Sequence, residues 1–212
     1  MTDDTRGEAE RAAQVWRASD SVACVAVGLA GTVALIALFP GGVLSRITHG
    51  VLHLPGPGSA ICALYGPLIV LCALLAARWA RKPGAALFCC AVLGLLHSVF
   101  MPILFPSAKT AGTVGPLPLR ILGVLLLGAF LEFLTQFLAR RSPWLRYLVS
   151  AACANLALLL FYWAAVYPLT GKRPVSAGGA AVLIGVALVA GALLGGFVPA
   201  LLSRERPRRA NT

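Results

Sequence analysis

The sequence predicts an all-α integral membrane protein, a bundle of six transmembrane helices with both termini in the cytoplasm. Three observations predict this class. Hydrophobic residues make up 59% of the 212 residues and charged residues only 12%, with a mean hydropathy of +0.86, which is a membrane composition. The apolar residues occur in repeated runs of roughly the 20 residues that a helix needs to cross a hydrocarbon core. The basic residues fall between these runs.

Six apolar runs follow one another along the chain, and each predicts one transmembrane helix. The predicted helices are Ser21–Phe39, Ala60–Ala77, Gly84–Leu104, Leu119–Leu138, Leu145–Tyr167 and Gly178–Leu201. The chain is therefore divided into a cytoplasmic N-terminal segment at 1–20, a transmembrane domain at 21–203 and a basic cytoplasmic tail at 204–212. The first twenty residues hold five of the seven acids, so the first run is expected to stay as a span rather than act as a cleaved signal peptide.

The basic residues sort by side of the membrane, which explains the net charge of +11. Thirteen of the 18 flank the spans on the side of the two termini, and five flank the other side. The positive-inside rule places the richer side in the cytoplasm. Nucleic-acid binding is a poor alternative, because the charge is distributed by topology. The five residues on the other side are Arg46, Lys109, Arg120, Lys172 and Arg173.

Polar residues inside the spans are the candidate substrate-binding residues, because burying a charge in hydrocarbon costs at least a few kcal/mol. Glu132 is the acid that falls within a predicted span. Gln136 follows it by one helical turn and Gly128 precedes it by one turn, so the three share a face. A carboxylate, an amide and a gap on one face predict a recognition surface.

Further polar candidates lie on the third and fifth spans. His97 is aligned with Gly94 on one helical face, and Asn155, Tyr162 and Trp163 recur along another. His97, Asn155 and Tyr162 are also typical of hydrogen-bonded packing residues, so both roles stay open. A carboxylate that pairs with an aminopyrimidine or a cationic ring, together with aromatic faces for stacking, predicts a small polar heterocycle as ligand.

Small residues recur at helical spacing on two spans, which permits close contact between helices. Ala26, Ala30 and Ala34 form one row, and Ala187, Gly191 and Gly195 form the other. Packing within the chain and docking onto a separate membrane subunit both explain such rows.

The cysteines and the outer connections carry less information. All six cysteines fall inside apolar spans without a C-x-x-C pair, so we expect free thiols and no metal site. The connections at 40–59 and 105–118 are rich in glycine and proline, and they are either a lid over a site or simple connections.

Three other function classes stay open. An intramembrane hydrolase would use Ser59 with the nearby His53, although no G-x-S-x-G surrounds the serine. A metal-uptake subunit would use His49 and His53, four residues apart, with His97 elsewhere. A structural or assembly protein of the membrane needs no particular site.

The residues "RKPGAAL" at 81–87, followed about forty residues later by "GAFLEF" at 128–133, resemble the YkoE-type S components of energy-coupling factor (ECF) transporters. The likeness covers roughly residues 59–140. It implies a subunit, not itself an enzyme, that captures a small vitamin or precursor such as thiamine or hydroxymethylpyrimidine in a prokaryotic cytoplasmic membrane. The family places an acid in the fourth span, where this chain has Glu132.

The resemblance also implies partners. The Ala26, Ala30 and Ala34 row is similar to the motif by which S components dock on a transmembrane T subunit, and two ATPase subunits supply the energy. The chain has no Walker A sequence and needs no cofactor of its own. Cys89 and Cys90 stand where that family commonly has a second acid.

The basic asymmetry predicts the labelling of single cysteines introduced into a cysteine-free variant. Lys82→Cys should react with a membrane-impermeant maleimide only from the cytoplasmic side, and Lys109→Cys only from the outside, because the two lysines flank opposite ends of predicted spans. The measurement compares intact cells with inverted vesicles. Reaction of both positions from one side would contradict the six-span topology.

Overall fold

The fold is a bundle of helices that confirms the predicted class. The structure, a computed structural model, describes residues 16–38, 46–55, 58–105, 117–170 and 175–204, and these residues contain no strand. Six helical stretches are long and apolar enough to cross a membrane. They are Ala18–Leu38, Ile61–Ala80, Ala85–Leu104, Leu117–Phe137, Pro143–Leu169 and Ala177–Ser203.

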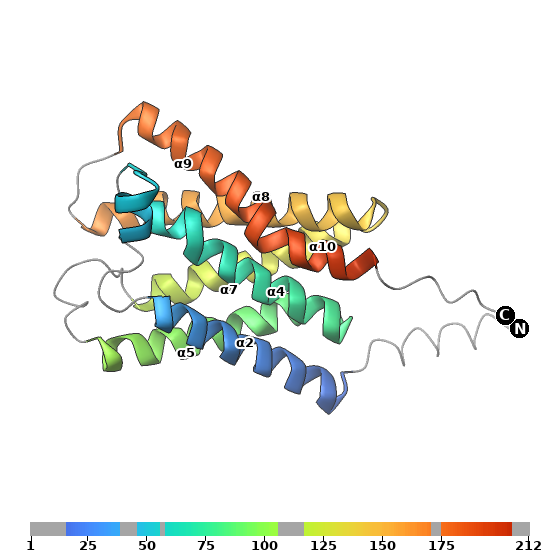
Figure 1. Cartoon of the computed structure of the whole chain (residues 1–212). Helices are drawn as coiled ribbons and strands as arrows, with labels where there is room; N and C mark the ends of the chain where they lie inside the picture. Colours follow the sequence, from blue (N-terminus) through green and yellow to red (C-terminus); the bar gives the residue numbers. More distant parts are fainter. Residues whose placement is uncertain (1–15, 39–45, 56–57, 106–116, 171–174, 205–212) are drawn as a thin grey trace, which may run out of the picture.

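Three of the six spans change helical type along their length. The second, fifth and sixth spans each contain a π-helical stretch, in which backbone hydrogen bonds reach back five residues instead of four. The elements, labelled as in Figure 1, are α2 (Ala18–Leu38), η2 (Arg46–Val51), η3 (Ile61–Tyr65), α4 (Gly66–Ala80), α5 (Ala85–Leu104), α7 (Leu117–Phe137), α8 (Pro143–Phe161), η4 (Tyr162–Val166), η5 (Tyr167–Thr170), α9 (Ala177–Ala190), η6 (Gly191–Gly196) and α10 (Phe197–Arg204).

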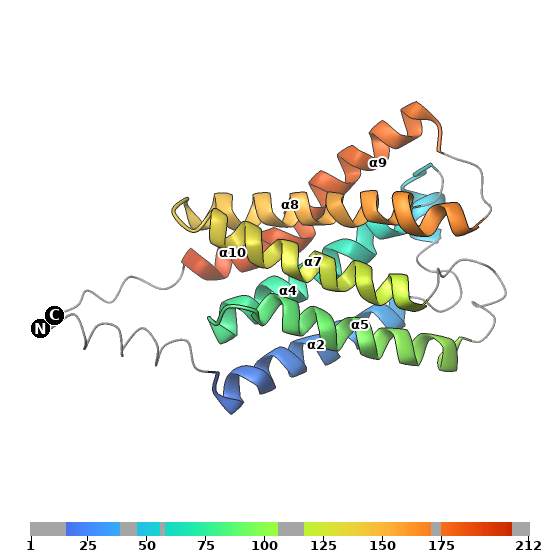
Figure 2. The same cartoon turned by 180° about the vertical axis from the view of Figure 1, so that it is seen from behind.

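The spans run up and down, so the bundle has two distinct ends (Figures 1 and 2). The basic end holds the start of α2, the α4–α5 turn, the α7–α8 turn and the end of α10. The loop end holds η2, the start of η3, the end of α5, the start of α7, η5 and the start of α9. The predicted topology would place the basic end in the cytoplasm.

Local sequence explains where the helices begin and end at both ends. Ser142 caps α8 by accepting a hydrogen bond from the Leu145 N–H at 3.3 Å, and Pro143 follows at the first helical position. Ser176 caps α9 in the same way. The α4–α5 turn places Arg81 and Gly84 at positive φ, so it reverses the chain within a few residues.

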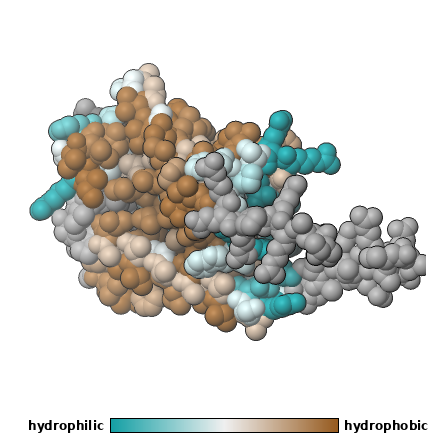
Figure 3. Space-filling model, turned by 45° about the vertical axis from the view of Figure 1, so that its right-hand side comes forward, coloured by the Kyte–Doolittle hydropathy of each residue, from teal (hydrophilic) through white to brown (hydrophobic). Residues whose placement is uncertain are grey.

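α4 is the central helix, and apolar side chains surround the bundle. α4 contacts α2, α5, α7, α8, η6 and α10, and its span is the most buried of the six. Many large apolar side chains point outward instead, including Val22, Val33, Ile103 and Val189. Figure 3 shows apolar surface between two hydrophilic ends. An apolar exterior between polar ends fits a lipid environment.

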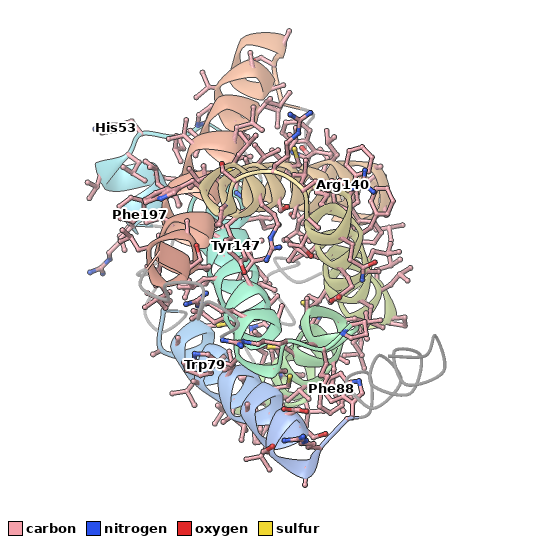
Figure 4. All side chains as sticks on the ribbon, turned by 90° about the vertical axis from the view of Figure 1, so that its right-hand side faces the viewer. His53, Trp79, Phe88, Arg140, Tyr147 and Phe197 are labelled. Atoms are coloured by element: carbon pink, nitrogen blue, oxygen red, sulfur yellow. The ribbon has the colours of Figure 1, made fainter. Side chains whose placement is uncertain are left out.

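A view along the bundle from the basic end separates inward from outward aromatic residues (Figure 4). Tyr147 is buried among the helices, whereas Trp79, Phe88 and Phe197 lie at the periphery. Aromatic side chains at the periphery near one end are typical of the membrane interface. A hydrogen bond from Arg78 to the Leu202 carbonyl joins α4 to α10 at the basic end.

The sixth span presses its small residues against α8 and α4. A Cβ on Gly191 would lie 2.7 Å from the Ala151 carbonyl oxygen, and one on Gly195 would lie 2.9 Å from a Val70 methyl carbon. Ala187 is fully buried as well. For the row Ala187, Gly191 and Gly195, packing within the chain is therefore the correct explanation.

This close approach predicts opposite effects for two alanine substitutions on the sixth span. Gly191→Ala should destabilise the protein by about 1–3 kcal/mol, because the new methyl group overpacks the contact with α8. Gly185→Ala is the matched control: no atom lies within 4 Å of its added Cβ, and alanine favours the helix. Thermal denaturation in detergent measures both. Equal destabilisation by the two variants would contradict the packing argument.

Candidate ligand-binding site

The predicted site residues separate into two groups along the bundle. Glu132 hydrogen-bonds near the start of α5, at Ala86, whereas His97 hydrogen-bonds to Tyr65 further along the same helix. Ala86 and His97 are eleven residues apart in α5, which is about 16 Å of axial rise. Glu132 and Gln136 therefore lie towards the basic end, and His97 lies towards the loop end.

Asn155 is a fully buried cross-link between three spans. Its side-chain amide nitrogen donates to the carbonyl oxygens of Cys62 and Ala187, both at 2.8 Å. Its Oδ1 faces Gly66, where a Cβ would lie only 2.0 Å away. Gly66 is thus required for Asn155 to fit, and the packing role left open for Asn155 is present in the structure.

The Asn155 bonds fall at two π-helical stretches. Cys62 lies within η3, and Ala187 lies in the last turn of α9, just before η6. Departures from α-helical bonding leave carbonyl groups whose partners must come from elsewhere in the protein, because lipid supplies none. The Asn155 amide supplies a donor to Cys62, and it gives the Ala187 carbonyl, which also accepts from the Gly191 N–H, a second donor.

A second polar group at the loop end joins three spans. The Tyr65 hydroxyl lies 3.0 Å from Nδ1 of His97, and the two rings meet edge to face at 5.3 Å. Tyr65 ends η3 and His97 lies in α5. α7 packs against α5 here: a Cβ on Gly94 would lie 3.3 Å from the Val124 side chain. His97 lies one turn beyond Gly94 in α5 and Arg120 one turn before Val124 in α7, so the two share the same level of this contact. We call Tyr65, His97 and Arg120 the loop-end cluster.

Arg120 is the least satisfied member of this cluster. Its Nε and Nη1 are shielded from solvent, yet neither has a hydrogen-bond partner among the described residues. A guanidinium carries five N–H donors and a permanent charge. Leaving such donors unpaired away from water costs free energy, so this position is poised for an acceptor from outside the chain.

Tyr162 and Trp163 lie over another part of the loop end. A Cβ on Gly58, which has a φ of +98°, would lie 3.1 Å from Nε1 of Trp163 and 3.8 Å from Cδ1 of Tyr162. Gly58 therefore allows the chain to pass directly beneath these rings before η3 begins. The Tyr162 ring also lies 6.3 Å from that of Tyr167.

His49, in the first connection, holds this part of the chain against the start of the second span. Nε2 of His49 lies 3.2 Å from the Ser59 hydroxyl, and its Nδ1 lies 2.8 Å from the Leu54 carbonyl oxygen. Leu54 packs with Cys62 in a small apolar core. Ser59 thus pairs with His49 and not with His53, which is exposed at a φ of 49°.

The resulting pair resembles a nucleophile and its base only in its distances. The Ser59 residue is 1% exposed, so a substrate has no direct approach to its hydroxyl. The pair instead fastens residues 46–55 to the start of the second span. Among the described residues, no group of three or more His, Cys, Asp or Glu could hold a metal ion.

The Glu132 carboxylate makes hydrogen bonds that give it a structural role. Its Oε2 accepts a hydrogen bond from the Ala86 N–H at 3.3 Å, and its Oε1 accepts one from Gln136 at 3.2 Å. Ala86 is the second residue of α5, and Gly84 before it has no side chain to cap the helix. The carboxylate of α7 therefore caps α5. Its role as a ligand anchor stays a prediction.

The first small-residue row lies on the outside of the bundle. Ala26 and Ala30 are exposed and Ala34 is partly buried, whereas Gly28 and Gly31 of the same helix face the core. A Cβ on Gly31 would lie 2.7 Å from the Cys72 sulfur atom, so glycine makes the internal contact. Ala26 and Ala30 are consequently left for lipid or for another subunit.

Two members of the loop-end cluster are absent from the predicted site. Arg120 was counted as a topological charge, because a cation close to the start of an apolar run is ordinary there. Tyr65 carries no such signal, because one aromatic residue in an apolar span is ordinary.

Comparisons with protein-family models, with curated proteins and with solved structures found no match for this chain.

The capping role of Glu132 predicts a graded effect on stability. Glu132→Leu should destabilise the protein by about 1 kcal/mol, the usual cost of a lost helix cap, because the Ala86 N–H loses its acceptor. Glu132→Gln keeps an acceptor oxygen of the same shape and should lose less. Thermal denaturation of both variants provides the measurement. A larger loss for glutamine than for leucine would contradict the cap.

Proposed function

We propose that this chain is the substrate-capturing subunit, or S component, of an ECF-type importer in a prokaryotic cytoplasmic membrane. The observation that carries the proposal is the loop-end cluster, where polar side chains from three spans meet and two guanidinium nitrogens lack a partner. Ionisable side chains inside a membrane protein usually mark a binding site or a pathway. With the basic end in the cytoplasm, this cluster faces the external side, from which an importer takes its substrate.

The exposed face of α2 supports a partner subunit. Ala26 and Ala30 present small side chains to the outside of the bundle, so a second helix could approach the α2 backbone closely. A transmembrane T subunit would dock there and link the chain to two ATPase subunits. The chain itself captures the substrate and performs no catalysis in this proposal.

The packed first connection supports capture at the loop end. Leu54 is buried in the small apolar core, and His49 is bonded to Ser59, so the described part of this connection covers the start of η3. The resemblance supports a small vitamin or precursor as the substrate.

The docking role predicts the effect of one bulky substitution on α2. Ala30→Trp should abolish co-purification of a T subunit and ATPases with the tagged chain from native membranes, because the indole prevents close helix contact. Leu126→Trp, at an exposed position on α7, is the matched control and should retain the partners. Quantitative mass spectrometry of the purified complexes gives the measurement.

Two results would contradict the proposal. One is the absence of ATPase subunits from the wild-type preparation. The other is equal recovery of the partners with Ala30→Trp and Leu126→Trp. Thermal denaturation of both variants shows whether a loss of partners reflects misfolding, in which case Ala30→Ser and Ala30→Leu provide a graded series of side-chain size.

A further inference from the structure

We infer that the loop-end cluster binds the carboxylate group of a small organic anion, with Arg120 as its counter-ion. The inference rests on the proposed function, since it names the chemical class of the captured molecule. It differs from the cationic or aminopyrimidine ligand expected for Glu132.

The charge balance leaves Arg120 without an acid of its own. Asp20 and Glu132 are the two acidic residues that the structure describes, and both lie towards the basic end. The remaining acids of the sequence fall at 3–10 and at 205, on the predicted cytoplasmic side. A cation held partly away from water needs a nearby negative charge to offset its desolvation. Within the described chain none is near Arg120, so we look for it outside the chain.

The cluster offers hydrogen-bond donors rather than acceptors to a ligand. Nε and Nη1 of Arg120 carry hydrogens and have no partner in the described part of the chain. The Tyr65 hydroxyl and a neutral His97 ring have one hydrogen each, and their mutual bond uses one of the two. One hydrogen of the pair therefore remains, whichever of the two donates. Together with the Arg120 N–H groups, this donor matches a group with two acceptor oxygens.

One positive charge favours a single carboxylate over a phosphate group. A phosphate monoester carries close to two negative charges at neutral pH and would need further cations. Arg46 is the other described arginine at the loop end, and its side chain is exposed on η2. Nε and Nη1 of Arg120 are shielded from solvent instead, which favours a ligand held inside the protein.

The first experiment identifies what the protein retains during purification in a phosphate-free maltoside detergent. Small molecules extracted from wild type, Arg120→Gln and the control Arg46→Gln are compared by mass spectrometry. We expect an organic carboxylate in wild type and Arg46→Gln, reduced about tenfold or more in Arg120→Gln, as for a lost hydrogen bond to a charged group. Arg120→Lys keeps the charge and should retain part of the ligand.

The second experiment uses a matched pair of probes on the same preparations. Benzoate and benzamide have nearly the same shape and differ in charge, so a greater thermal stabilisation by benzoate reports the counter-ion. We expect this difference in wild type and Arg46→Gln and its loss in Arg120→Gln. Removing an unpaired charge should leave Arg120→Gln folded.

The following outcomes would overturn the inference. A retained ligand that is neutral or cationic, or one unaffected by Arg120→Gln, excludes Arg120 as counter-ion. Loss of the retained ligand in Glu132→Gln but not in Arg120→Gln would place the ligand at the basic end. Saturation by phosphatidylglycerol, with no carboxylate retained and no preference for benzoate, assigns Arg120 to a lipid headgroup. Each of these leaves the T-subunit experiment above unaffected, so the two proposals fail independently.

Discussion

The absence of hydrogen-bond partners in hydrocarbon is the constraint on which the loop end of this protein depends. Every backbone group that departs from regular α-helical bonding must be satisfied inside the chain. Asn155 meets this requirement at Cys62 in η3, and it gives the Ala187 carbonyl a second donor beside the Gly191 N–H. One buried side chain therefore joins η3, α8 and α9. Gly66 and Gly191 leave the space that this side chain occupies.

The polar residues of the two ends perform different physical tasks. At the basic end, Glu132 completes the hydrogen bonding of a helix whose own first residues supply no cap. At the loop end, Tyr65 and His97 share one hydrogen bond, and Arg120 is left with unpaired donors. Both carboxylate oxygens of Glu132 have hydrogen-bond partners, whereas the loop-end cluster has donors left for an additional group. This difference, rather than the number of polar residues, is the reason for proposing a binding site at the loop end.

Much of the fold could be predicted from sequence, because hydrophobic runs and cations report directly on the membrane. All six spans were found within a few residues of their observed limits. The glycine row of the sixth span was recognised, but not its partner, since the spacing of small residues does not say which helix approaches. The exposure of Ala26 and Ala30 could not be read from the spacing either.

The site was harder to predict because its contacts cross between spans. The acceptor for Ala86 comes from Glu132, 46 residues further along the chain. Glu132 and His97 were grouped from the sequence as residues of one site. In the structure, their hydrogen bonds lie at different levels along the axis of α5. The prediction that Ser59 pairs with His53 was wrong. The structure places His49 beside Ser59 and leaves His53 exposed.

The two tethers of α5 also bear on how the bundle can deform. Glu132 holds its start to α7, His97 holds its later part to Tyr65, and Gly128 brings the α7 backbone against Leu87 and Cys90. Sliding α5 by one turn, about 5.4 Å, would break both hydrogen bonds and move Cys90 away from Gly128. Movement of α5 along its own axis is therefore costly in free energy. α5 and α7 form a stiff unit that would change orientation by tilting together.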